Sequence, residues 1–210
     1  MSVAVAVYDS DQEALVPASE AGPASKWIVA SYGFWIFLLS DIVMFSALFA
    51  AYAVLHRATA GGPAGRDLFN QASVALETGC LLLSSYACGL MSLAVSGRRF
   101  CATYLAALVT FVLGGGFLFL ELREFANMIA SGATPERSAF LSAFFTLVGC
   151  HGLHVLAGLF WLITMMIQVV LWGFRDVVQR RLRCFSLFWH ALDIIWVGIF
   201  TVVYLIGVSP

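Results

Sequence analysis

The sequence predicts an all-α polytopic membrane protein, a bundle of five transmembrane helices, and three observations support this fold class. First, 61% of the 210 residues are hydrophobic and 11% are charged, whereas soluble domains contain about 45–50% apolar and about 25% charged residues. Second, the apolar residues gather in five runs, and each run reaches the roughly 20 residues that a bilayer span needs. Third, the connections between the runs are short, so we expect consecutive helices to be antiparallel neighbours.

The first 26 residues differ in composition from the rest of the chain. They read MSVAVAVYDSDQEALVPASEAGPASK, which is mixed and acidic. A cleaved signal peptide has a basic segment followed by an apolar run, and this stretch has neither. We therefore expect residues 1–26 to form a disordered or loosely ordered tail, and residues 27–210 to form the five-helix transmembrane domain.

The predicted spans follow in order along this domain. They are residues 27–55, 72–96, 101–129, 139–173 and 184–208. An ideal helix over the fourth run would be about 52 Å long at 1.5 Å per residue, which exceeds a hydrocarbon core of about 30 Å. The run is too short for two spans and a turn, so we expect one long helix that tilts or projects beyond the membrane. Gly and Pro mark the connections at 56–71 and 131–138 as turns.

The basic residues predict the orientation of the helices. Seven of the eleven lie in the N-terminal flank and in the second and fourth connections: Lys26, Arg98, Arg99, Arg175, Arg180, Arg181 and Arg183. The other four lie on the opposite side: Arg57, Arg66, Arg123 and Arg137. The positive-inside rule then favours a cytoplasmic N-terminus. An odd number of spans places the C-terminus on the outer side.

Composition also excludes several classes of function. A net charge of -1 gives no basic field for nucleic acid. The five cysteines form no C-x-x-C pair, so we predict neither a disulfide nor a zinc site. The absence of an evident internal repeat argues against a transporter built from duplicated halves.

Ionisable residues inside membrane spans are functional hypotheses because they are costly to bury. The stretch FLLSDIVMF places Asp41 at the centre of the first span, with no basic residue within a turn or two. Burial disfavours a charged carboxylate. Asp41 is then either a neutral carboxyl bonded to a neighbouring helix or a group that takes part in proton movement, and the sequence leaves both open.

Glutamates lie near the outer ends of the second and third spans. Glu77 recurs with nearby serines at helical spacing, which favours an interhelical polar contact over a substrate site. In FLELREF, Glu121 and Glu124 share one helix face, and Arg123 can extend toward the headgroups. These three residues predict an interfacial ion cluster.

Histidines pair with polar residues on the last two spans. His151 and His154 lie three apart in GCHGLHVLAG, and His190 and Asp193 lie three apart in WHALDIIW. Three histidines and a carboxylate on two helices are able to make a metal or haem site. Interhelical hydrogen bonds are the alternative, and residue physics favours it because a metal site needs a supporting shell of partners.

Three stretches together resemble a known family. GFWIFLLSDIVMF, FLSAFFTLVGCHGLHVLAGLFW and SLFWHALDIIWVGIFTVVYL are similar, in this order, to subunit III of haem–copper terminal oxidases. The five spans, with LETGCLLLSS and SGATPERSAFLSAFF, resemble most closely its bo-type ubiquinol oxidase branch.

The resemblance implies a non-catalytic subunit without haem or metal. The haems and copper would lie in subunit I, the main contact of this chain, with subunits II and IV in the same complex and phospholipid bound between helices. His151, His154, His190 and Asp193 would then be interhelical polar pins. Asp41 matches a membrane-buried carboxylate of the family, in a position that is usually glutamate. The resemblance also implies a bacterial inner membrane location with a periplasmic C-terminus.

Two alternatives stay beside this interpretation. The chain is similar enough to cytochrome c oxidase subunits that the electron donor is either ubiquinol or cytochrome c. The second alternative is a free-standing membrane haem or metal protein. It would require His151, His154 and His190 to converge on one point.

Overall fold

The computed structural model describes residues 4–6, 15–17, 26–61 and 71–206. Within these residues, five helices are long and apolar enough to cross a membrane. The predicted all-α membrane bundle is therefore confirmed. The chain divides into two compact units, residues 1–39 and residues 40–210.

The first unit contains a short strand pair and the beginning of a helix. Strands β1 (Ala4–Ala6) and β2 (Leu15–Pro17) are antiparallel, with Val5 opposite Val16. Helix α1 (Lys26–Leu55) starts in this unit and continues into the second. The remainder of the tail predicted over residues 1–26 lies outside the described residues.

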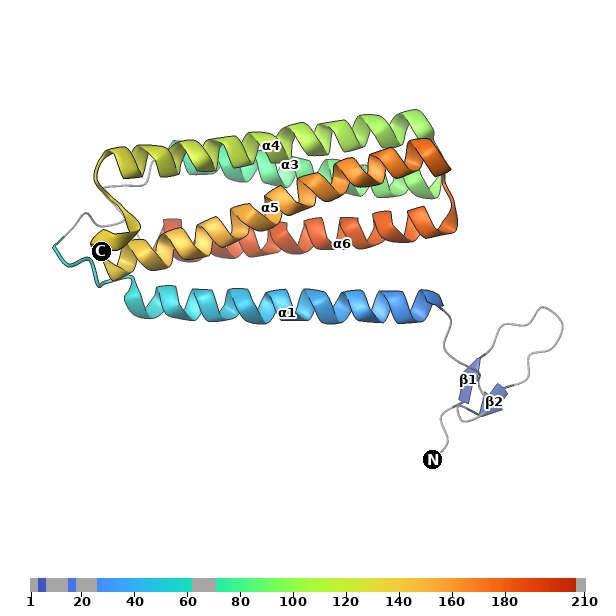
Figure 1. Cartoon of the computed structure of the whole chain (residues 1–210), viewed down its shortest axis with the longest axis horizontal. Helices are drawn as coiled ribbons and strands as arrows, with labels where there is room; N and C mark the ends of the chain where they lie inside the picture. Colours follow the sequence, from blue (N-terminus) through green and yellow to red (C-terminus); the bar gives the residue numbers. More distant parts are fainter. Residues whose placement is uncertain (1–3, 7–14, 18–25, 62–70, 207–210) are drawn as a thin grey trace. The chain divides into compact units, whose positions relative to one another are not determined.

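The second unit is a helix bundle. Its helices are the later part of α1, then α3 (Gln71–Ser96), α4 (Phe100–Ala130), α5 (Ala139–Trp172) and α6 (Asp176–Ile199). Consecutive helices from α3 to α6 are neighbours, and α3 also packs against α6 (Figure 1). A 3₁₀ turn, η1 (Pro135–Arg137), precedes α5, and a π-helical segment, η2 (Phe200–Ile206), continues α6.

Local signals fix both ends of the long helix α5. The Ser138 hydroxyl accepts a hydrogen bond from the Leu141 amide at 3.2 Å, which caps the first turn. Gly173 ends the helix with a φ of 65°, a conformation that glycine adopts without a steric penalty. The helix has 34 residues and is inclined to α4 and α6 (Figure 1), as expected for a helix longer than the bilayer core.

The last helix starts eight residues earlier than the predicted span, at Asp176 rather than Cys184. The predicted spans leave the segment from 176 to 183 in the fourth connection. It is instead an amphipathic helical turn, with Val178 and Leu182 buried one turn apart and Arg181 exposed. The end of the predicted span, residues 207 and 208, lies outside the described residues.

The later part of α1 contacts α5 through aromatic side chains. The Phe45 ring lies 5.3 Å from the His154 ring, and the Tyr52 ring lies 6.1 Å from that of Phe140. Among the described residues, α1 does not pack closely against α3, which differs from the expectation for consecutive helices.

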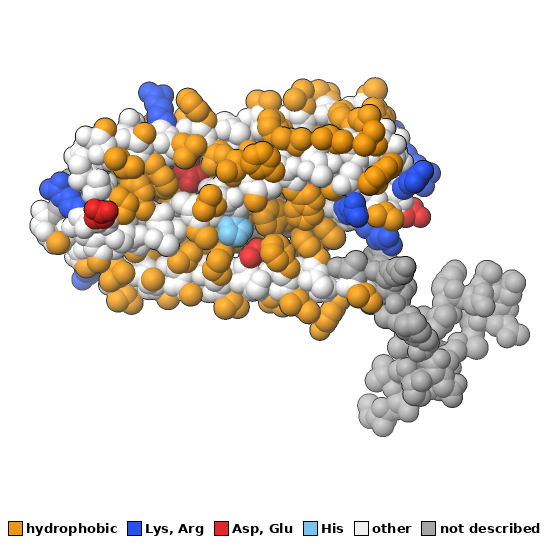
Figure 2. Space-filling model, in the orientation of Figure 1, with side chains coloured by type: hydrophobic (Ala, Val, Ile, Leu, Met, Phe, Trp, Pro, Cys, Tyr) orange, Lys and Arg blue, Asp and Glu red, His pale blue; other side chains and the backbone are white. Residues whose placement is uncertain are grey.

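Hydrophobic side chains cover the middle of the molecule, and basic side chains gather toward its ends (Figure 2). Basic side chains gather in the same way at the aqueous ends of membrane proteins.

Candidate functional site

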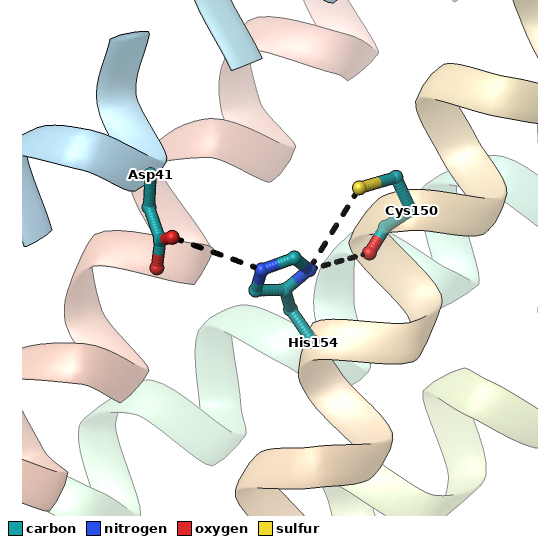
Figure 3. A network of polar contacts seen from close by, with 3 residues as sticks. All are labelled: Asp41, Cys150 and His154. Atoms are coloured by element: carbon teal, nitrogen blue, oxygen red, sulfur yellow. Dashed lines mark hydrogen bonds and ion pairs between the residues drawn. The ribbon is translucent and has the colours of Figure 1, made fainter. Parts of the chain in front are cut away.

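The Asp41 carboxyl on α1 faces the His154 ring on α5 (Figure 3). The distance from Asp41 Oδ1 to His154 Nε2 is 4.0 Å. On its other side, the His154 ring donates its Nδ1–H to the Cys150 carbonyl oxygen at 2.7 Å, with the Cys150 sulfur at 3.9 Å. This local bond fixes the tautomer of a neutral ring and leaves Nε2 directed at the carboxyl.

The two side chains are close to each other but are not directly hydrogen-bonded. A separation of 4.0 Å is too long for a direct hydrogen bond, and one water molecule is able to bridge it. A carboxyl group and an imidazole that share one proton form a pair without net charge. A pair without net charge limits the cost of burial in an apolar medium.

His151 has different surroundings although it lies only three residues earlier. Its side chain is fully buried, and its Nε2–H donates to the Leu192 carbonyl oxygen on α6 at 3.3 Å. The ring packs against Phe117 and Trp196, with ring centroids 5.6 and 5.2 Å away. The two histidines therefore have separate hydrogen-bond partners. No three His, Cys, Asp or Glu side chains of the described residues are grouped as metal ligands.

His190 joins α6 to α3. Its Nδ1 is 2.7 Å from the Ser85 hydroxyl oxygen. Asp193 lies one turn along α6 beside the same two residues, although its Oδ1 has no hydrogen-bond partner among the described residues. His151 and His190 thus each bond to a residue of another helix.

Two tryptophans make further interhelical contacts that sequence reasoning missed. The Trp189 indole N–H donates to the Ser84 hydroxyl at 2.9 Å, and the Trp196 N–H donates to the Thr78 hydroxyl at 3.1 Å. A Cβ at Gly114 or Gly158 would lie 2.7 or 2.8 Å from the Trp189 ring. These two glycines make room for an indole.

The three residues of the predicted interfacial ion cluster do not share one environment. Glu121 is inside the bundle with an exposed fraction of 3%, Glu124 is half-buried, and Arg123 is exposed. Residues two apart on a helix differ by about 200° in direction, whereas residues three apart share a face. Arg123 therefore points away from the side on which the two glutamates lie.

Glu77 is also inside the bundle, with an exposed fraction of 1%. The hydrogen bond predicted from Glu77 to a neighbouring helix is not found among the described residues, where neither of its carboxyl oxygens has a partner. Glu77 and Glu121 come from different helices and lie close enough to repel each other when charged.

Comparisons with known proteins place this arrangement in a family. Residues 21–208 match a protein-family model described as cytochrome c oxidase subunit III. The cytochrome bo(3) ubiquinol oxidase subunit 3 of Pseudomonas putida is 48% identical over 176 residues, which cover 84% of this chain and 85% of that protein. The corresponding Pseudomonas aeruginosa protein is 49% identical over 178 residues, 84% of each chain. The cytochrome c oxidase subunit 3 of Bacillus sp. PS3 is 42% identical, over 83% of this chain and 84% of that protein.

Proposed function

The chain belongs to the cytochrome c oxidase subunit III family, and on that premise we propose that it is subunit III of a proton-pumping ubiquinol oxidase. The observation that carries this proposal is its 48–49% identity to two bo(3) ubiquinol oxidase subunits, over 84% of this chain. The complex oxidises ubiquinol, reduces oxygen to water and moves protons outward. This chain is a non-catalytic subunit that supports assembly, lipid binding and sustained turnover.

In this proposal the haems and copper belong to subunit I. The polar contacts of the three histidines support that assignment. His151 donates to a backbone carbonyl group, His154 bonds to the Cys150 carbonyl oxygen, and His190 bonds to a serine hydroxyl. Each ring has a protein partner for one nitrogen, and the contacts go to three separate places.

A second candidate is subunit III of a cytochrome c oxidase. The observation that favours it is the 42% identity to the cytochrome c oxidase subunit 3 of Bacillus sp. PS3. The two candidates differ in the electron donor of the complex, and the described polar groups of this chain are compatible with both.

Subunit I is the main protein partner in this proposal, and subunits II and IV complete the complex. Large apolar side chains are exposed along the helices, among them Tyr86, Leu93 and Leu105. Lipid tails and partner helices both cover such surfaces in a membrane.

The proposed location of the chain is the bacterial inner membrane. Its N-terminus is cytoplasmic and its C-terminus periplasmic, as the distribution of basic residues predicts.

Phospholipid binding has a structural candidate between α3 and α4. A groove of about 600 Å³ there has mostly apolar walls, including Leu90, Leu93 and Leu105, and Arg99 lines it as well. Arg99 immediately precedes α4, at the end where the sequence places the cytoplasmic surface. We expect an acyl chain of an anionic phospholipid in the groove, with its phosphate bound by Arg99.

The experiment that tests the function is purification of the tagged chain from its native membranes in mild detergent. We expect haem-containing partner chains to co-purify and oxygen uptake to be driven by ubiquinol. Uptake driven only by reduced cytochrome c would support the second candidate. A chain that purifies alone, with its own haem or metal, would contradict both.

A further inference from the structure

Three glutamates lie together in the interior of the bundle, away from the Asp41–His154 pair. Glu77 comes from α3, and Glu121 and Glu124 come from α4. Glu77 and Glu121 have exposed fractions of 1% and 3%. Each of the three is close enough to another to interact electrostatically. We call these residues the glutamate cluster.

A tyrosine from η2 lies beside the cluster, and a second tyrosine, from α1, lies beside the first. The fully buried Tyr204 on η2 is within electrostatic reach of all three glutamates and of Tyr52 on α1. Helix α5 contributes backbone, because the Glu121 carboxyl lies over Gly152, where a Cβ would be 2.5 Å from Oε1. The immediate surroundings of the cluster therefore include α3, α4, α5 and η2.

Several buried polar atoms of this region lack partners. Among the residues that the structure describes, the following have no hydrogen-bond partner: both carboxyl oxygens of Glu77, Oε2 of Glu121, Oε1 of Glu124 and the hydroxyl of Tyr52. Tyr52 has an exposed fraction of 2%, so its hydroxyl is a buried polar group outside the glutamate cluster. Buried polar atoms of native proteins almost always have a partner, which is often an ordered water molecule.

No cation of the described residues is in position to neutralise the cluster. Arg123, on the same helix, is exposed, and the helix geometry directs it away from Glu121 and Glu124. His151, next to Gly152 on α5, uses its Nε2–H for the Leu192 carbonyl oxygen. Carboxylates that share an apolar site without a cation cannot all stay ionised, because both desolvation and mutual repulsion disfavour the charge.

We propose that the glutamate cluster is a proton-binding site inside the bundle, in which Glu77, Glu121 and Glu124 hold bound protons at neutral pH and ordered water connects their carboxyl groups with Tyr52 and Tyr204. Water supplies the hydrogen bonds that the orphaned oxygens lack. The bound protons keep the charge of the site low enough for the membrane interior. The site uses none of the residues of the Asp41–His154 pair, so it goes beyond the proposed function and does not depend on the electron donor.

Infrared spectroscopy of the purified complex tests the bound protons. The C=O stretch of a protonated carboxyl is separate from the carboxylate stretches and shifts in D2O. We expect Glu121→Gln and Glu77→Gln each to remove a protonated-carboxyl band at neutral pH. Glu136→Gln is the matched control, because Glu136 is exposed in η1; it should remove carboxylate bands only. If both cluster variants lose only carboxylate bands and keep every protonated-carboxyl band, the proposal is overturned.

A density map of the wild-type complex tests the bound water and needs no variant. We expect ordered water within hydrogen-bond distance of Glu77 and Glu121. A dry cluster would overturn the proposal. A lysine or arginine from another subunit inserted between the glutamates would overturn it too, because the carboxylates would then be neutralised by an ion pair instead of by protons.

Discussion

At the scale of single residues, the absence of one side chain decides where a buried carboxyl lies. Gly152 stands between the two histidines of the motif GCHGLH. Its missing Cβ leaves space for the carboxyl of Glu121, whose three terminal atoms would lie 2.5–3.0 Å from a Cβ there. The backbone of α5 can therefore approach the Glu121 side chain of α4 closely.

Gly152→Ala is expected to displace the Glu121 carboxyl. Overpacking of a well-packed core costs about 1–3 kcal/mol, so we expect a lower thermal stability of the complex or weaker retention of this subunit. Thermal denaturation of the purified complex measures the effect. Gly149→Ala on the same helix is the control, because its Cβ would meet Phe125 at an ordinary 3.6 Å. Equal stability of the two variants would contradict the close packing at Gly152.

Asp41→Asn tests whether the carboxyl facing His154 is auxiliary. Asparagine preserves the size of the side chain and removes the acid, so we expect normal assembly and a normal initial rate of oxygen uptake. Any loss should appear only during sustained turnover, and a time course of oxygen uptake measures it. Asp176→Asn, at the exposed start of α6, serves as the control. Complete loss of oxygen reduction in an assembled complex would show that Asp41 is essential.

At the scale of helices, the contact between α3 and α6 combines packing with polar bonds. Along this contact α6 presents Trp189, His190 and Trp196, which bond to Ser84, Ser85 and Thr78 of α3. A buried polar group that loses its partner costs about 1–3 kcal/mol. The three bonds therefore fix the register of the two helices as well as their proximity.

His190→Leu is expected to weaken this contact without changing the haem content of the complex. The variant removes the bond to Ser85, and Ser85→Ala removes the same bond from the other side. We therefore expect the effects of the two substitutions on subunit retention to be less than additive in the double variant. A haem deficit in an otherwise intact complex would instead indicate that His190 acts on a cofactor.

Arg99→Gln is expected to reduce the anionic phospholipid that co-purifies with the complex. The substitution removes the cation at the groove between α3 and α4 and leaves the apolar walls unchanged. Lipid extraction and mass spectrometry measure the amount bound. Arg123→Gln, an exposed arginine near the other end of α4, is the control. If both variants retain the same lipid as the wild type, Arg99 does not bind the headgroup.

At the scale of the whole molecule, five spans and an uneven distribution of basic residues predict the topology. The helices that cross the membrane are those expected from composition, and an odd number places the two termini on opposite sides. Of the eleven basic residues, Arg66 lies outside the described residues. The other ten lie between the helices or within about two turns of a helix end.

Cysteine labelling tests this topology. In a Cys101→Ser background, which removes the exposed native thiol, we expect Glu136→Cys to react with a membrane-impermeant maleimide in right-side-out vesicles. Ser96→Cys, exposed at the end of α3, should react only in inside-out vesicles. The two variants control for each other, and the reverse pattern would place the N-terminus outside.

The sequence by itself determined the number of spans, most of their boundaries and the family, because these depend on hydrophobic runs, charge counts and ordered motifs. The role of the histidines as interhelical polar pins stays a prediction of the sequence and of the resemblance. The sequence could not separate Arg123 from Glu121 and Glu124, or place Glu77 among them, because helical periodicity assigns a residue to a face without saying what that face meets. The tertiary structure decided that Asp41 meets His154 and that Gly152 seats Glu121. The physical reason is that both contacts join residues far apart in the chain, and only the packing of the helices brings them together.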